Sequence, residues 1–461
     1  MEKAESGKTG LRVAIYDTRS KAISRRLTAA LRKAGHEVLC DGPLTPQTAA
    51  KDADIWLTKW TYNLKGPFLK DYHPVRGIVT LSMGTDHIDT AAVRELGLRL
   101  ESCPSFCSNS VAEHALALAM RTLHKKCVLP PLSEGQVIFT NFSDRRAENA
   151  VAQMLMRARQ LEASIRRAEN YDYGQHDRPW QNEELSAAKI GIVGHGSSAR
   201  KLARMVRYGF NCDVFSYDAP AELEAYGVKP LFLLDLIRKC DYIFLCTERY
   251  GMIDVRRTID SREFEDPAMR MTGSSVAVLG TGNIGMIIAR MARLGFGCSV
   301  TAFSRTPKKE AMGLGVKYVS PQLGVDSDPV TEVISGANIS FIGLSLNERT
   351  RGMLGKKQLA KLPADRPRVL VNVTRDEIIE SQALYDYICT GALTGYATDV
   401  LPNDKILCSG GLPDQLTRNF VQHKQVVATP HEGGCSRHSL KRLCMEALQK
   451  IDAIVRGETH G

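Results

Sequence analysis

Residues 275–306 read SVAVLGTGNIGMIIARMARLGFGCSVTAFSRT and decide the fold expected for this chain. An apolar run is followed by a glycine turn, a helix-length segment and a second apolar run. Gly280 permits a tight turn, Gly282 lets backbone approach a pyrophosphate, and Gly285 permits close packing of helix on strand. The helix that follows would present its N-terminus to the phosphates. The pattern is typical of a βαβ unit that binds a dinucleotide.

The same pattern occurs a second time, 86 residues earlier. Residues 189–220 read KIGIVGHGSSARKLARMVRYGFNCDVFSYDAP. The recurring residues are Gly194, Gly196, Ala203, Arg204, Met205, Arg207, Gly209, Phe210, Cys212 and Val214, which match Gly280, Gly282, Ala289, Arg290, Met291, Arg293, Gly295, Phe296, Cys298 and Val300. A shorter echo, 35 residues apart, joins AEHALA at 112–117 to AENAVA at 147–152. The chain therefore contains an internal duplication.

The later copy favours NADP over NAD. Its second strand is followed by Ser304, Arg305 and Thr306. An arginine with neighbouring hydroxyls suits a 2′-phosphate, whereas the carboxylate of NAD-type units would repel it. A basic surface loop without a ligand is the alternative interpretation.

The earlier copy ends differently. Asp218 stands at its strand end, as in NAD-type units, and Ala199 replaces the third glycine. Three interpretations stay open for it: a degenerate structural insertion, which we favour, a second nucleotide site at Gly194, Gly196 and Asp218, or a functional exchange with the later copy.

Composition narrows the class of protein. The 461 residues are 43% hydrophobic, which is enough for two or three domains with real cores. No apolar run is long enough to span a membrane, and MEKAESGKTG lacks a signal-peptide core, so we expect a cytoplasmic protein. The net charge of +10 is spread along the chain without basic–aromatic interleaving, which disfavours nucleic-acid binding. Twelve cysteines lack metal-ligand spacing, so we predict reduced thiols and no metal.

Periodicity predicts an α/β protein with mainly parallel sheets. Strands are expected at 11–17, 36–41, 53–60 and 75–84, helices at 20–35, 111–126, 154–169 and 436–457, and connectors at 130–144, 263–272 and 410–418.

Three polar residues near the C-terminus could carry chemistry. Arg375 follows the apolar run at 369–373, Asp404 follows the loop after Asp399, and His431 ends VVATPH. Arginine can clamp a carboxylate, histidine can move a proton near neutral pH, and an acid can orient the histidine.

These segments together resemble the D-isomer-specific 2-hydroxyacid dehydrogenases, a family that includes glyoxylate/hydroxypyruvate reductases, phosphoglycerate dehydrogenases and formate dehydrogenase. LSMGTDHIDTAAVRELGL at 81–98 and SNSVAEHALALA at 108–119 are similar to its substrate-domain loop and crossing helix. The segments at 369–400 and 426–434 are similar to its catalytic signatures.

The resemblance implies hydride transfer between NAD(P)H and a small 2-oxo or 2-hydroxy acid, with a role for each site residue. Arg375 would hold the substrate carboxylate and carbonyl, and His431 would exchange the proton. Asp404, where the family usually has Glu, would orient His431. The implied cofactor residues are Gly280, Gly282, Asn283, Ile284, Gly285, Ser304, Arg305, Thr306, Thr374 and Asp399, with Asp399 near the nicotinamide carboxamide; the substrate residues are Lys59, Trp60, Met83 and Gly84.

The resemblance also implies a domain plan. A Rossmann-type doubly wound cofactor domain at 274–424 would accompany a flavodoxin-like substrate domain, with its N-terminal part and crossing helix at 11–124 and its returning segment at 425–461. An extra βαβ lobe would be inserted at 130–272. Since the catalytic residues all follow the later copy, Gly280–Gly285 should be the working site. Family members commonly dimerise through the cofactor domain and crossing helices, although the inserted lobe could cover that surface.

Two departures keep a second class open. Asp376 stands where the family has Gly, beside the expected anion site, and Asp404 is shorter than Glu. A non-catalytic protein that senses NAD(P) and binds partners is therefore the alternative. A relative of adenosylhomocysteine hydrolase would share the cofactor domain but fits VTRDEII and TPHEGG poorly.

Overall fold

The computed structural model describes most of the chain. The described residues are 10–16, 20–123, 137–140, 147–173, 182–218, 221–246, 258–260, 270–319, 328–363 and 366–457. They form three sheets, and every strand pair in them is parallel.

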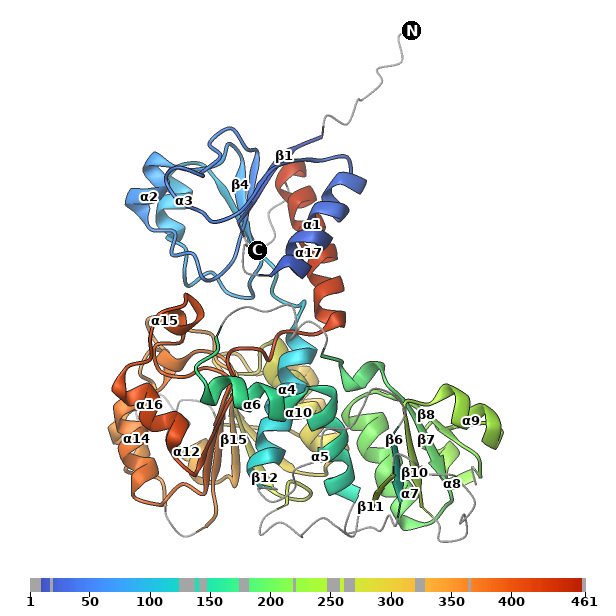
Figure 1. The fold of residues 1–461 in the computed structure, drawn as a ribbon. Coiled ribbons are helices and arrows are strands. Elements are labelled where there is room, and N and C mark those ends of the chain that lie inside the picture. The colour runs from blue at the N-terminus through green and yellow to red at the C-terminus, as the bar shows by residue number, and fades with distance from the viewer. Residues whose placement is uncertain are drawn as a thin grey trace.

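The N-terminal sheet has the flavodoxin-like order β2-β1-β3-β4-β5. Its strands are β1 (Arg12–Tyr16), β2 (Glu37–Asp41), β3 (Ile55–Thr58), β4 (Gly77–Thr80) and β5 (Arg99–Ser102), and its helices are α1 (Lys21–Lys33), α2 (Gly66–Asp71) and α3 (Thr90–Glu95). Ser20 caps α1, and Gly35 beyond its end has a φ of +87° that favours glycine. The C-terminal helix α17 (Arg437–Arg456) returns to pack beside α1 (Figure 1).

The C-terminal sheet has the order β14-β13-β12-β15-β16-β17-β18, which begins as the Rossmann order does. Its strands are β12 (Ser275–Leu279), β13 (Ser299–Phe303), β14 (Lys317–Val319), β15 (Ile339–Ile342), β16 (Val369–Asn372), β17 (Gly395–Thr398) and β18 (Val426–Ala428). Its helices are α10 (Asn283–Arg290), α11 (Lys309–Gly313), α12 (Pro329–Ser335), α13 (Lys356–Leu359), α14 (Ser381–Cys389), α15 (Asp404–Cys408) and α16 (Gln415–Gln422). Because β18 belongs to this sheet, the domain extends past the predicted boundary at 424.

The middle lobe is larger than the single βαβ unit expected. Its order is β11-β6-β10-β7-β8-β9, a half-Rossmann set (β7, β8 and β9) extended by three strands. The strands are β6 (Val137–Thr140), β7 (Lys189–Val193), β8 (Asp213–Ser216), β9 (Lys229–Pro230), β10 (Tyr242–Leu245) and β11 (Thr258–Asp260), and the helices include α7 (Ser197–Arg204), α8 (Ala221–Glu224) and α9 (Leu233–Lys239). The interpretation of 130–144 as a connector is wrong, because β6 lies within it and pairs with β10.

Two other element predictions are also wrong. The helix expected at 154–169 is broken at Gln160, whose φ of 45° is left-handed, into α5 (Ala147–Ala158) and α6 (Leu161–Glu169). The loop expected at 410–418 ends early because Asp414 caps α16 by accepting from the Thr417 amide. The connector at 263–272 lies mostly outside the described residues.

Helices α4 (Ser108–Leu123) and α5 join the lobes. α4 packs on α10 and on β16 and β17, while α5 packs on α4 and α7 (Figure 1). One buried apolar cluster runs through all three sheets, with Val13, Leu116, Val151, Ile190 and Val276 among its members. Among the described residues, no helix is long and apolar enough to cross a membrane.

Candidate active site

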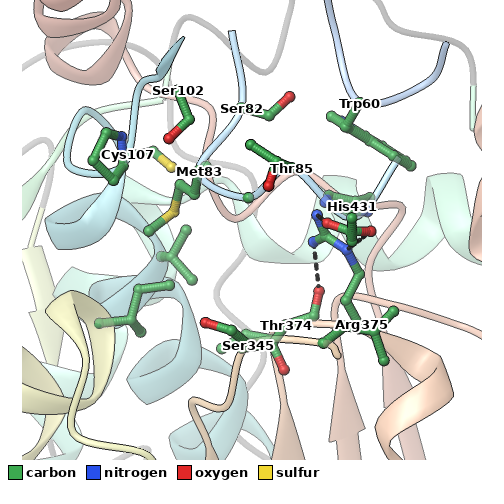
Figure 2. A pocket seen from close by; sticks show the side chains of 18 of the residues that line it. Trp60, Ser82, Met83, Thr85, Ser102, Cys107, Ser345, Thr374, Arg375 and His431 are labelled. Carbon is green, nitrogen blue, oxygen red and sulfur yellow. Dashed lines mark hydrogen bonds and ion pairs between the residues drawn. The ribbon is translucent and has the colours of Figure 1, made fainter. Parts of the chain in front are cut away.

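A cavity of about 840 Å³ opens between the N-terminal and C-terminal sheets. Segments that follow β3, β4 and β5 line one side, and segments that follow β12, β15, β16, β17 and β18 line the other. Parallel sheets gather functional side chains at the carboxyl ends of their strands, and this cavity lies there. Figure 2 shows Trp60, Thr374, Arg375 and His431 among its lining residues.

The predicted proton-transfer pair is assembled at one end of the cavity. His431 Nδ1 lies 2.6 Å from Asp404 Oδ2, and the Trp60 ring stacks on the imidazole with 4.5 Å between ring centroids. Burial alone would lower the pKa of His431, but the Asp404 and Asp399 carboxylates outweigh burial and raise it. Asp404 is buried at the start of α15, so the shorter side chain does reach the imidazole.

Asp399 organises the loop that carries His431. Its Oδ1 accepts from the Glu432 amide at 2.9 Å and the Thr429 hydroxyl at 2.6 Å, and its Oδ2 accepts from the Gly433 amide at 2.8 Å. A Cβ on Gly433 would meet Asp399 Oδ2 at 2.8 Å, so the loop needs glycine there. Asp399 lines the cavity, as a cofactor contact would, but both carboxylate oxygens are bonded within the protein.

Arg375 faces a carboxylate that was not predicted as a site residue. Its Nη2 and Nε lie 3.2 and 3.4 Å from the two oxygens of Asp86, and Lys405 Nζ lies 3.4 Å from Asp86 Oδ2. Burial would raise the pKa of Asp86, but Arg375 and Lys405 outweigh it and lower the pKa to about 2. Asp86 belongs to the TDHID segment quoted for the resemblance, and that position was the available signal.

Asp376 does not turn its carboxylate toward the anion site. Its Oδ2 accepts from the Asn403 amide at 3.0 Å, and Asp376 is not among the residues that line the cavity. Burial, a hydrogen bond with Glu377 and the nearby Asp404 raise the pKa of Asp376 well above its usual range. A largely protonated carboxyl adds little repulsion toward a substrate anion.

The later glycine turn fits a pyrophosphate. Gly280 has a φ of +91°, and a Cβ on Gly285 would meet the Gly280 carbonyl oxygen at 1.9 Å, so both positions require glycine. A Cβ added at Gly282 would have no other atom within 4 Å, which leaves open space before α10. Gly282, Asn283 and Ile284 line the cavity together with Thr374.

The remaining predicted residues divide by position. Lys59, Trp60, Met83 and Gly84 all line the cavity on the side of the N-terminal sheet. Ser304, Arg305 and Thr306 follow β13 at the neighbouring strand end; Ser304 is half-buried, the other two are exposed, and none is a lining residue.

The earlier glycine turn lies apart from the cavity. Gly194 and Gly196 have φ values of +103° and +99°, and Asp218 is exposed beyond β8. None of the three lines the cavity. Ala199 carries a real Cβ where one at Gly285 would clash, so the two turns cannot have the same close packing of strand and helix.

One group of potential metal ligands occurs among the described residues. Asp404, Cys408 and His431 offer ligand atoms within 4.8 Å of one another. Two of these atoms are the hydrogen-bonded pair of the proposed proton-transfer site, so the cluster belongs to that site.

Comparison with known proteins decides the family. The model of the D-isomer specific 2-hydroxyacid dehydrogenase NAD binding domain matches residues 151–266 and again 251–433. The chain belongs to this family. Each match contains one copy of the glycine motif, and the later match also contains Arg375, Asp404 and His431.

Curated relatives match over part of their length. The glyoxylate reductase of Korarchaeum cryptofilum is 25% identical over 186 residues, covering 40% of this chain and 50% of the relative. The hydroxypyruvate reductase of Thermotoga maritima is 27% identical over 201 residues, covering 42% and 59%. The chain thus spans about half the length of the curated relatives that it matches.

Solved structures share the fold across nearly the whole chain. The D-lactate dehydrogenase of Aquifex aeolicus, complexed with NAD and lactic acid, has a TM-score of 0.59 at 15% identity, covering 97% of this chain and 96% of that one. The pyruvate reductase of Chlamydomonas reinhardtii has a TM-score of 0.59 at 20% identity, covering 98% of each. At these identities the likeness shows the fold alone.

Proposed function

We propose that this protein is an NAD(P)-dependent oxidoreductase that interconverts a small 2-oxo acid and the 2-hydroxy acid, of the glyoxylate or hydroxypyruvate class. The observation that carries the proposal is the pairing of His431 with Asp404 at 2.6 Å in the cavity that also holds Arg375 and the open turn at Gly282. A proton donor, a cation for a carboxylate and a pyrophosphate cradle share one space.

The residues divide the work of reduction. Arg375 would bind the substrate carboxylate through the Nη1–Nη2 edge of its guanidinium, while Asp86 holds the Nε–Nη2 edge in place. His431 would donate a proton from Nε2 to the carbonyl oxygen, since Asp404 engages Nδ1 and raises the pKa of the imidazole. Trp60, stacked on His431, would limit the ring's movement and exclude water. The bound nicotinamide supplies the hydride.

NADPH is the proposed preferred form of the cofactor. Gly282, Asn283 and Ile284 would hold the pyrophosphate, and Ser304, Arg305 and Thr306 would contact the ribose end. Arg305 is exposed next to two hydroxyl side chains, with no carboxylate among Ser304–Thr306 to repel a 2′-phosphate.

Steady-state reduction of glyoxylate and hydroxypyruvate, with NADPH and with NADH, tests the function. We expect turnover of at least one acid, with kcat/KM about ten-fold higher for NADPH because each lost charged contact costs about 1.4 kcal/mol or more. Arg305→Ala should remove that preference. Nucleotide binding without turnover of either acid would instead support the non-catalytic alternative.

The pH dependence of reduction should follow the pairing of His431 with Asp404. Reduction needs protonated His431, whose raised pKa extends activity above the ordinary histidine value of about 6.5. In Asp404→Asn, burial and Arg375 still lower the pKa of His431, and of the two carboxylates that raise it Asp399 alone remains, so kcat/KM should fall off at lower pH than in the native protein. Asp404→Glu keeps a carboxylate and should keep the native profile. Identical profiles for Asn and native proteins would rule out this pairing as the source of the pH dependence.

A further inference from the structure

The middle and C-terminal lobes meet through a pseudo-symmetric interface. Arg204 Nε donates to the Leu294 carbonyl at 3.0 Å, and its counterpart Arg290 donates from Nη1 to the Tyr208 carbonyl at 3.1 Å. Phe210 and Phe296 contact each other edge to face with ring centroids 6.1 Å apart. Residues that are 86 apart in sequence thus exchange partners across the interface, as the two halves of an isologous dimer do.

The crossing helices repeat this exchange. Glu113 on α4 accepts from the Leu185 amide at 2.7 Å, just before β7, although α4 packs on α10 of the C-terminal lobe. Glu148 on α5 accepts from the Met271 amide at 2.7 Å, just before β12, although α5 packs on α7 of the middle lobe. Helix α4 therefore packs on the C-terminal lobe but hydrogen-bonds to the residues before β7 of the middle lobe. Helix α5 packs on the middle lobe but hydrogen-bonds to the residues before β12 of the C-terminal lobe.

We infer that the described residues 147–173, 182–218 and 221–246 act as a built-in partner subunit for the C-terminal lobe. We also infer that Arg159 is a positioning residue of the catalytic loop, the segment at 430–435 that carries His431. The inference rests on the proposed function. The resemblance implied a homodimer, but we infer a single chain instead. The face of the C-terminal lobe that carries Arg290 and Phe296 is already covered by the middle lobe.

Arg159 contacts the catalytic loop directly. The residue is fully buried at the break between α5 and α6. Its Nη2 donates to the carbonyls of Gly433 at 2.9 Å and Cys435 at 3.1 Å, two and four residues after His431. Its Nη1 donates to Ser110 Oγ at 2.9 Å, and that hydroxyl donates to the same Gly433 carbonyl at 2.9 Å. The guanidinium thus fixes backbone that Asp399 holds from the opposite side.

Neighbouring residues of the same segment hold the loop as well. Arg167 pairs with the Glu432 carboxylate, and Ser164 Oγ donates to it at 2.6 Å. Tyr173, which is 4% exposed, is the one described residue between α4 and β12 that lines the cavity. Residues of the duplicated segment thus line the cavity, through Tyr173, and hydrogen-bond to the loop that carries His431, through Arg159, Ser164 and Arg167.

Arg159→Met and Arg159→Lys test the positioning role. A loop displaced by about 1 Å should lower kcat about a hundred-fold in Arg159→Met, and Lys should restore part of it. Dinucleotide affinity, measured by fluorescence titration, should not change. The pH profile of kcat/KM in Arg159→Met should also shift to lower pH, because displacement of the loop separates His431 from Asp404, the carboxylate that raises its pKa most. The other charged groups that act on the imidazole are Asp399, which raises its pKa, and Arg375, which lowers it. Arg204→Ala, which also removes an arginine–carbonyl bond between lobes but lies away from the loop, should keep native kcat and profile.

Three further measurements keep the outcomes distinct. Ser110→Ala removes one hydrogen bond to the Gly433 carbonyl with little loss of side-chain volume, and it should also lower kcat. It replaces Arg159→Met as the test if that variant does not fold. NMR titration of the His431 imidazole in native and Arg159→Lys proteins reports the surroundings of the imidazole without any need for turnover. If the native protein reduces no 2-oxo acid, the proposed function is wrong, but this titration still tests the role of Arg159. Sedimentation should give a monomer. An unchanged kcat and imidazole titration in the Arg159 variants, or a native dimer, would overturn the inference.

Discussion

His431→Gln should lower kcat for reduction of a 2-oxo acid by about 10³-fold, within the range found for removal of a general acid. Glutamine can still hydrogen-bond to Asp404, so the loop should keep its place, but it carries no proton that titrates near neutral pH. The loss should therefore appear in kcat, with little change in the KM for the acid or in the affinity for the dinucleotide.

His438→Gln is the matched control for this prediction. His438 lies on α17, seven residues from His431, and its Nδ1 is 3.6 Å from Glu183, away from the cavity. It should keep native kcat. If His431→Gln retains native turnover, the proton comes from another group and the proposed mechanism is wrong.

Arg375→Met should raise KM for the 2-oxo acid and lower kcat/KM by about 10⁴-fold, since a site built to pair with a carboxylate loses its partner. Asp86 adds a second effect. Without Arg375, Lys405 and His87 still oppose the rise in the Asp86 pKa that burial causes, but an anionic substrate meets a carboxylate with less positive charge beside it. Arg375→Lys should recover part of the loss, because it restores charge but not the fork.

Measurement of KM and kcat for these two variants separates charge from geometry. Arg349→Met is the control, because Arg349 is exposed and does not line the cavity. A native KM in Arg375→Met would show that the substrate carboxylate binds elsewhere.

The sequence patterns predicted the sheet architecture well because strand and helix periods were strong and punctuated. Alternating apolar runs with Gly35 after the first helix indicated the N-terminal sheet, and the glycine turn at Gly280 indicated the Rossmann order. The break at Gln160 could not be predicted, since residues 154–169 contain neither glycine nor proline. Buried contacts of Arg159 accompany the break, and such tertiary contacts leave no local pattern.

The candidate site was predictable in part for a related reason. Arg375, Asp404 and His431 each follow an apolar run, and parallel strands bring such positions to one edge. Asp86 contacts Arg375, which is 289 residues away in sequence, and Arg159 contacts Gly433, which is 274 residues away. Contacts over such separations exist only in the folded chain, so no pattern in the sequence indicated them. The duplication was plain in the sequence, but the exchange of Glu113 and Glu148 between lobes was not.

The central claim is that one nucleotide site per chain, at the later glycine turn, serves catalysis. Titration of NADPH into native protein and into Gly282→Val and Ser197→Val tests it most directly. Valine suits Gly282, whose φ is −69° and whose Cβ would enter open space, whereas Gly196 with φ +99° would be strained, so its helix neighbour Ser197 is changed instead. We predict one site in native and Ser197→Val proteins and none in Gly282→Val. Two sites in the native chain, or a site lost in Ser197→Val and kept in Gly282→Val, would contradict the account.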